Sequence, residues 1–334
     1  MFKLTRRAAI ASVAALGLAA SAIPAMAQDK ITFTLATSGS ETDQRSVAMA
    51  EVFAPMVAGF ADYQAGYNGT LFAQGTELEA IASGNLTMSI ASAQELAQFF
   101  PEFSIFATGY VHQDAAHQVR VFNDPLMDPF KQTVEDELGV KPLSVMYLGR
   151  RHVNLRQTRE ELDVQPPADL AGVNLRMPGT DAWQFLGAAL GASPTPLAFS
   201  EVYTSLSSGA IDGQDNPLPT VVDQKFYEVT SQIALTSHLV DLNYIAFSVE
   251  TWNSLTPDQQ LTVQRAADAA AAYGRLKQLD KENNLADFIR SQGVEIYTPD
   301  LEAFRTHVQA QYVGSEAAAS WPEGVLERIN ALGN

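Results

Sequence analysis

The sequence contains no cysteine among its 334 residues. This absence excludes disulfide bonds, thiolate catalysis, metal sites built on cysteine, and a lipid anchor attached to a cysteine behind an export signal. Histidine is also scarce, and the spacing of His112 and His117 suits joint metal ligation on a helix poorly. The Gly-x-Ser-x-Gly, phosphate-loop and His-Glu-x-x-His motifs are missing as well. We therefore expect no metal, no cofactor and no enzymatic activity.

Basic residues are few, because 21 Lys and Arg face 38 Asp and Glu, which gives a net charge of −17. A chain this acidic is a poor candidate for binding nucleic acid or anionic lipid. An anion site in such a protein would be a local exception that depends on individually placed arginines.

Long apolar runs are missing beyond the first residues of the chain. Lys3, Arg6 and Arg7 precede an apolar run over 8–23, and Ala25 to Ala27 have the small side chains of a cleavage site. This pattern predicts a signal peptide over 1–27 that is cleaved after about Ala27. The run is short for a retained membrane anchor, which is the alternative. The Arg6–Arg7 pair also occurs in twin-arginine signals, so the export route stays open.

The stretch 172–217 carries the strongest local pattern of the sequence. Residues 173–177 alternate apolar and polar, which predicts a half-buried strand with Arg176 on its polar face. A helix, a second strand and a short helix are predicted to follow, and the stretch ends in a polar turn that contains Asn216. Arginine offers a planar fork to two oxygens and asparagine adds a neutral donor, so this pattern suits a carboxylate ligand.

The runs 194–203 (PTPLAFSEVY) and 209–217 (GAIDGQDNP) resemble the core motif of the DctP-type solute receptors of TRAP (tripartite ATP-independent periplasmic) transporters. The preceding run 175–178 (LRMP) is similar to the same family, and weaker similarity extends over about 31–270. The chain departs from the family at Asp215, where the family usually has glutamate. The resemblance implies a periplasmic location.

The resemblance also implies a set of ligand-binding residues. Arg176 matches the arginine that pairs with the ligand carboxylate, and Asn216 matches a donor to a carboxylate or hydroxyl. Phe199 matches a position against the ligand. Arg151 matches a second arginine, although a slip of the alignment would put Arg150 in its place.

The first half of the chain offers further candidates. Thr37 lies in a predicted turn from a strand to a helix, and such turns often face the ligand cleft of an α/β domain. Ser92 and Gln94 follow the predicted strand 86–90, where the family tends to place variable ligand contacts.

The pattern of elements predicts an α/β fold with the two-lobe architecture of periplasmic binding proteins (Venus-flytrap). A similarity between 81–86 and 206–211 suggests two lobes of similar build, each a mixed sheet flanked by helices. We expect the first lobe to comprise 28–149 plus 242–280 and the second 150–241 plus 281–334. A capping box at 256–259 predicts a helix over 257–291, roughly 50 Å long, that bridges both lobes.

The expected function is that of an extracytoplasmic receptor. It would bind a small organic acid (a sugar acid, a hydroxy acid or a C4 dicarboxylate) between two closing lobes and deliver it to an integral-membrane TRAP permease. The alternatives are a receptor for an ABC-type importer or a membrane sensor kinase, a sulfonate receptor, and a secreted α/β hydrolase or lyase. We expect a monomer, because no coiled-coil or interface stripe stands out.

Overall fold

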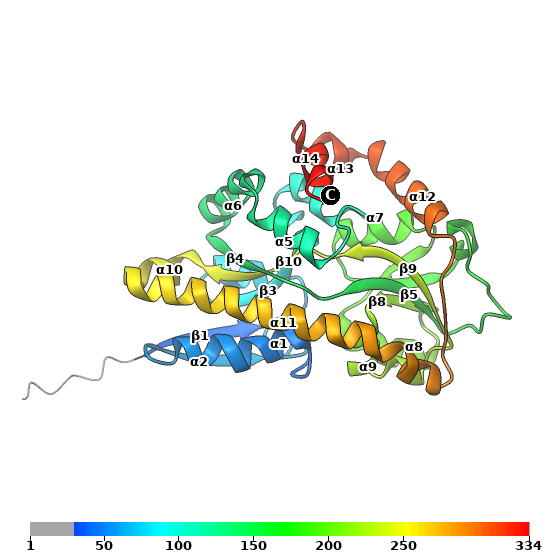
Figure 1. Ribbon diagram of the computed structural model, residues 1–334, viewed down its shortest axis with the longest axis horizontal. Helices are drawn as coiled ribbons and strands as arrows, with labels where there is room; N and C mark the ends of the chain where they lie inside the picture. Colours follow the sequence, from blue (N-terminus) through cyan, green and yellow to red (C-terminus); the bar gives the residue numbers. More distant parts are fainter. Residues whose placement is uncertain (1–29, 334) are drawn as a thin grey trace, which may run out of the picture.

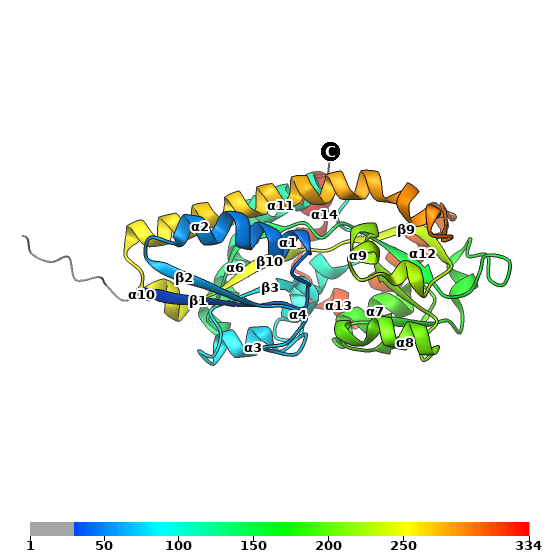
Figure 2. The same ribbon diagram turned by 90° about the horizontal axis from the view of Figure 1, so that it is seen from below.

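A computed structural model describes residues 30–333, so the signal peptide predicted at 1–27 lies outside the described residues. Two sheets form two lobes that lie side by side along the longest axis of the molecule (Figures 1 and 2). Within the described range, no helix has the length and apolar character needed to cross a membrane.

The sheet of the first lobe has five strands in the order β2-β1-β3-β10-β4. Its strands are β1 (Ile31–Ala36), β2 (Ala61–Gly66), β3 (Met88–Ser92), β4 (Val140–Met146) and β10 (Asn243–Ser248). β1 runs parallel to β2 and β3, whereas β10 runs antiparallel to β3 and β4. The alternation in β1 buries Phe33 and Leu35 on one face, where the Phe33 ring meets Phe247 edge-on at 5.2 Å between centroids.

The sheet of the second lobe has six strands in the order β11-β9-β5-β8-β6-β7. Its strands are β5 (Arg150–Leu155), β6 (Asn174–Met177), β7 (Ser193–Pro196), β8 (Gly213–Asn216), β9 (Gln232–Val240) and β11 (Glu295–Tyr297). β6 pairs in parallel with β7 and β8, and β5 runs antiparallel to β8 and β9. Both sheets are therefore mixed, in agreement with the expected fold class.

Helices cover both faces of each sheet. Those of the first lobe are α1 (Gln44–Ala48), η1 (Met49–Phe53), α2 (Ala54–Val57), α3 (Glu77–Ala82), α4 (Ala93–Leu96), η2 (Pro101–Ala107), α5 (Ala115–Asn123), η3 (Pro125–Met127), α6 (Asp128–Thr133), η4 (Val134–Leu138) and α10 (Val249–Ser254). Apart from the long helix α11, the remaining helices are η5 (Pro167–Leu170), α7 (Asp181–Ala189), η6 (Phe199–Glu201), α8 (Val202–Ser208), α9 (Leu218–Asp223), η7 (Phe226–Glu228), α12 (Leu301–Val313), α13 (Glu316–Ala319) and α14 (Val325–Ala331).

The long helix α11 (Pro257–Ser291) runs along both lobes (Figure 2). It begins at the expected capping box, in which Thr256 N donates to Gln259 Oε1 at 2.8 Å and Gln259 N donates to Thr256 Oγ1 at 3.3 Å. Its alanine-rich first half is buried against α1, η1 and β4, and its second half lies against α9 and β11.

The last helices return to the first lobe. Ile329 on α14 is fully buried in the first lobe's core, and its carbonyl oxygen lies 2.7 Å from His117 Nε2 on α5. Trp321, between α13 and α14, donates to Ser104 Oγ on η2 at 2.8 Å. This end of the chain thus packs against the first lobe, whereas the expected boundaries place 281–334 in the second. Its helices are short and amphipathic, and their sequence does not specify which core they cover.

The chain changes sheets between β4 and β5 and again between β9 and β10. At the first change, Gly149 has a φ of +123°, and Glu282 on α11 accepts hydrogen bonds from Tyr147 Oη and Arg150 N, both at 2.6 Å. At the second change, Asp241 and Leu242 are buried. Both crossings converge on one place between the lobes, next to the cavity described below.

Candidate binding site between the lobes

A cavity lies between the two lobes, and the empty space there, together with the open solvent at its mouth, is about 500 Å³. Both lobes and both crossings contribute to its wall: Ser38, Arg45, Gln74, Ile90, Ser92, Glu95, Leu148, Arg151, Arg176, Pro178, Trp183, Phe199, Asn216, Thr220, Asp241 and Asn243. Most of these side chains are polar or charged. Three of them are arginines, so the wall suits a small, polar, anionic ligand.

Arg176 is a buried cation with neutral partners. It lies on β6, and only 1% of its surface is exposed. Its Nε donates to Leu197 O at 2.8 Å and its Nη2 donates to Gln74 Oε1 at 3.0 Å. Among the described residues, no carboxylate forms an ion pair with it. Burial lowers the pKa of Arg176 to about 9, against the opposing effect of Asp215. An anion bound here would offset the cost of burying the charge.

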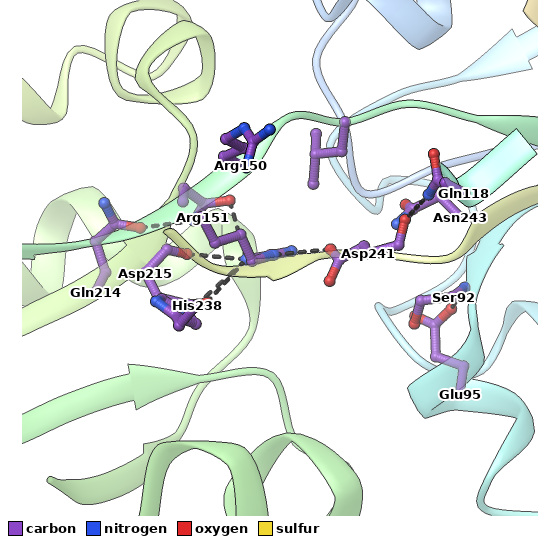
Figure 3. Close-up of polar contacts among 12 residues, drawn as sticks. Ser92, Glu95, Gln118, Arg150, Arg151, Gln214, Asp215, His238, Asp241 and Asn243 are labelled. Atoms are coloured by element: carbon purple, nitrogen blue, oxygen red, sulfur yellow. Dashed lines mark hydrogen bonds and ion pairs between the residues drawn. The ribbon is translucent and has the colours of Figure 1, made fainter. Parts of the chain in front are cut away.

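Arg151 differs from Arg176 because carboxylates surround it (Figure 3). Its Nε donates to Asp241 Oδ2 at 2.7 Å, and its Nη1 donates to Asp215 O at 2.9 Å with the Asp215 carboxylate 3.4 Å away. Its guanidinium carbon also lies 4.4 Å from the centre of the Trp183 ring. Burial alone would lower the pKa of Arg151, but Asp241 and Asp215 raise it above the ordinary value.

A hydrogen-bond network behind Arg151 fixes β8. Asn216 Nδ2 donates to Gln214 Oε1 at 2.6 Å, and Gln214 Nε2 donates to Asn154 Oδ1 at 2.9 Å. Asp215 Oδ2 lies 3.2 Å from His238 Nε2. All these side chains are buried, so the network holds Asn216 in the cavity wall in a fixed orientation.

The wall from the first lobe has its own charged pair. Arg45 donates to Asp43 at two points, from Nε to Oδ1 at 3.0 Å and from Nη2 to Oδ2 at 2.7 Å. Its Nη1 donates to Asn243 Oδ1 at 2.8 Å. Burial alone would raise the pKa of Asp43, but Arg45 lowers it below the ordinary value.

Glu95, at the start of α4, completes this wall. Its Oε2 accepts a hydrogen bond from Ser92 N at 2.7 Å. Burial and the nearby Asp241 raise the pKa of Glu95 to about 7, although Ser92 and Arg45 favour its charged form. Within residues 30–333, no group of three His, Asp or Glu side chains is arranged to hold a metal ion.

Five of the eight predicted site residues line this one cavity: Arg176, Asn216, Arg151, Phe199 and Ser92. Three do not line it. Gln94 is fully buried, Thr37 is buried and accepts a hydrogen bond from Gly39 N, and Arg150 is held through its backbone by Glu282. The direct contact of each residue with a ligand stays a prediction.

Sequence reasoning missed several other wall residues: Arg45, Gln74, Glu95, Trp183, Asp241 and Asn243. One local signal was available, because Glu95 follows Ser92 at the spacing of a capping box. The others reach the cavity through contacts between distant parts of the chain.

Comparisons with known proteins point to one family. The model of bacterial extracellular solute-binding protein family 7 (DctP) matches residues 34–317. A sialic acid-binding periplasmic protein of Vibrio cholerae is 30% identical over 76% of this chain and 77% of that protein. A TRAP periplasmic solute-binding protein of Roseobacter denitrificans, solved with bound 3-deoxy-D-manno-oct-2-ulosonic acid (KDO), is 77% identical with a TM-score of 0.91, covering 91% of this chain and all of that one. Another from Roseobacter denitrificans, solved with L-galactonate, is 26% identical with a TM-score of 0.81 and covers 91% of this chain and 99% of that one.

Proposed function

The chain belongs to the DctP family of bacterial extracellular solute-binding proteins, and we therefore propose that its ligand is KDO or a closely related ulosonic acid. As a member of this family, the chain is a periplasmic binding protein that captures a small organic acid and passes it to TRAP permease subunits. The proposal includes two further points. The segment 1–27 is a cleaved export signal, and the receptor releases its ligand chemically unchanged.

The observation that carries the proposal is Arg176, a fully buried guanidinium in the cavity wall with neutral hydrogen-bond partners. A ligand carboxylate would supply the missing negative charge and accept a charge-assisted pair of hydrogen bonds. Asn216 lies in the same wall and would orient the acid group. Closure of the lobes would exclude water from this ion pair and strengthen it.

The assignment of the ligand to the ulosonic acids rests on similarity that covers 91% of the chain. The KDO-bound protein is 77% identical to this one, and the sialic acid-binding relative also takes an acid of the 2-ulosonic type. Such an acid joins one carboxylate to a chain of hydroxyl groups. The polar wall of the first lobe, with Ser92, Glu95 and Asn243, would face those hydroxyls. Galactonate is a weaker candidate, because the receptor solved with it is only 26% identical.

Calorimetry of the purified receptor tests this proposal. KDO, N-acetylneuraminate, L-galactonate and succinate would be titrated into the parent and into Arg176→Ala. We expect the parent to bind KDO and the variant to bind it at least about 30-fold more weakly, because removing one partner of a buried ion pair costs about 2–5 kcal/mol.

Two further variants make the result specific. Arg176→Lys keeps the charge without the planar fork, and we expect an intermediate loss of affinity. Arg290→Ala removes an exposed arginine on α11, far along the helix, and should leave binding unchanged. Tight binding of KDO by a folded Arg176→Ala, or failure of the parent to bind either KDO or N-acetylneuraminate, would overturn the proposal.

A further inference from the structure

The arginines of the cavity differ in how much of their charge is already balanced. Arg45 forms a two-point ion pair with Asp43. Arg151 contacts two carboxylates, those of Asp241 and Asp215. Arg176, in contrast, donates only to a backbone carbonyl and an amide. Among the described wall residues, a single guanidinium therefore remains to balance a carboxylate of the ligand.

Two carboxylates of the wall have acceptor capacity that the described protein groups leave open. Asp241 binds Arg151 through Oδ2, while its buried Oδ1 has no hydrogen-bond partner among the described residues. Glu95 accepts a hydrogen bond from Ser92 N through Oε2, and the Ser92 side chain also stabilises its carboxylate, which leaves part of its acceptor capacity open. Figure 3 shows Asp241 between Arg151 and the first lobe, with Glu95 and Ser92 on the first-lobe side. The part of the cavity beyond Arg176 thus presents acceptors.

We propose that Glu95 and Asp241 select the ligand's chemical class: they accept hydrogen bonds from its hydroxyl groups and reject a second carboxylate. The site then takes acids with one carboxylate and a hydroxyl-bearing remainder. This inference rests on the function proposed above and narrows it, because it removes C4 dicarboxylates and aldaric acids from the possible ligands.

The physical reason is that a ligand hydroxyl is attracted to the carboxylates of Glu95 and Asp241, whereas a ligand carboxylate is repelled by them. A hydroxyl donates to a carboxylate, and such charge-assisted hydrogen bonds are about twice as strong as neutral ones. A second ligand carboxylate would instead meet Glu95 and Asp241 in a partly dry cavity, where like charges repel strongly. Arg45 and Arg151 are already paired with carboxylates, so the described wall residues offer no spare cation to relieve the repulsion.

Glu95 is the residue to change, because Asp241 also holds Arg151. In Glu95→Gln the amide oxygen can still accept from Ser92 N, so the start of α4 keeps its hydrogen bond. Glu79→Gln is the matched control, since Glu79 is an exposed acid on α3 of the same lobe and does not line the cavity. Both variants lose the same formal charge.

The experiment titrates parent, Glu95→Gln and Glu79→Gln with KDO, D-glucarate and succinate at pH 8, above the raised pKa of Glu95 of about 7. We expect the parent and Glu79→Gln to bind KDO at least about 100-fold more tightly than either diacid. In Glu95→Gln, KDO should bind about tenfold more weakly and the preference over D-glucarate should shrink. The melting temperature without ligand should not fall, because a carboxyl beside Glu77 is removed.

The outcomes separate this inference from the proposed function. Equal KDO affinity in parent and Glu95→Gln, or a parent that binds a diacid as tightly as KDO, would overturn the selection by Glu95 while the sugar-acid receptor stands. A lower melting temperature with unchanged affinity would show that Glu95 is structural only. A parent that binds N-acetylneuraminate or L-galactonate instead of KDO would undergo the same comparison with that acid. A parent that binds none of the three would overturn both.

Discussion

Glu77 and Glu95 are neighbouring carboxyl groups at the starts of two helices of the first lobe. Glu77 is 5% exposed, and its Oε2 accepts a hydrogen bond from Gly75 N at 2.7 Å. Burial and the charge of Glu95 raise the pKa of Glu77 to about 8, against the backbone N–H groups that favour its charged form. The folded protein therefore holds the proton of Glu77 more tightly than the unfolded chain does.

The raised pKa of Glu77 predicts a pH dependence of stability. The contribution of Glu77 is fully present below its ordinary pKa of 4.5 and is lost as the pH rises towards about 8. We expect Glu77→Gln to match the parent in thermal unfolding near pH 4.5 and to be more stable at pH 8.5. The gap can reach a few kcal/mol, since each pKa unit corresponds to about 1.4 kcal/mol. A gap of the same size at both pH values would show that burial of the charge is not its cause.

Single residues also show what the sequence can predict about the site. Arg176 and Asn216 stand in a continuous local motif, so their place in one cavity wall is predictable. The partners of Arg151 are not, because Asp241 is 90 residues away and Asp215 is 64 residues away along the chain. Whether carboxylates already neutralise the charge of an arginine depends on such contacts, and only folding brings these residues together.

At the scale of secondary structure elements, Gly149 is the position most sensitive to substitution, because it links β4 of one sheet to β5 of the other. Its φ of +123° is strained for other residues, and a Cβ there would lie 2.6 Å from Glu282 Oε1 and 2.7 Å from Pro217 Cβ. Substitution would push α11 and the start of α9 away from the crossing strand.

We expect Gly149→Ala to lower the free energy of unfolding by about 2 kcal/mol or more, from backbone strain and the two close contacts. Urea denaturation followed by circular dichroism measures this. Gly59→Ala is the control, since a Cβ at Gly59 has no neighbour within 4 Å. A loss in Gly149→Ala no larger than that in the control would contradict the constraint described for this link.

Secondary structure elements were predictable where the signal is local. The capping box at 256–259 and the periodic pattern that follows it predicted the bounds of α11. The alternation of apolar and polar residues predicted strands at β1 and β6. The placement of α13 and α14 was not predictable, because a short amphipathic helix can cover the core of either lobe. Their packing on the first lobe depends on contacts such as those of Ile329 and Trp321.

At the scale of the whole molecule, Gln74 connects the two lobes across the cavity. It lies between β2 and α3 of the first lobe, and its Oε1 accepts from Arg176 Nη2 and from Phe199 N of the second lobe, both at 3.0 Å. These bonds exist only when the lobes are close, so they favour the closed arrangement.

We expect Gln74→Ala to open the lobes more often and to weaken ligand binding by about three- to tenfold, since each lost hydrogen bond contributes about 0.5–1.5 kcal/mol. Small-angle scattering would show a larger radius of gyration for the variant without ligand, and calorimetry would give the affinity. Gln132→Ala, an exposed glutamine on α6, should behave like the parent. An unchanged radius together with unchanged affinity would show that Gln74 does not influence closure.

The contact between the Arg151 guanidinium and the Trp183 ring offers a way to measure ligand binding by fluorescence. Trp183 lies in the cavity wall, whereas the other two tryptophans of the chain, Trp252 and Trp321, lie outside it. Indole emission responds to nearby charge and to exclusion of water, and of the three tryptophans only Trp183 lines the cavity where a docked acid would alter both. The protein therefore carries an intrinsic optical reporter at its own cargo site, and uptake can be timed in solution without attaching a dye.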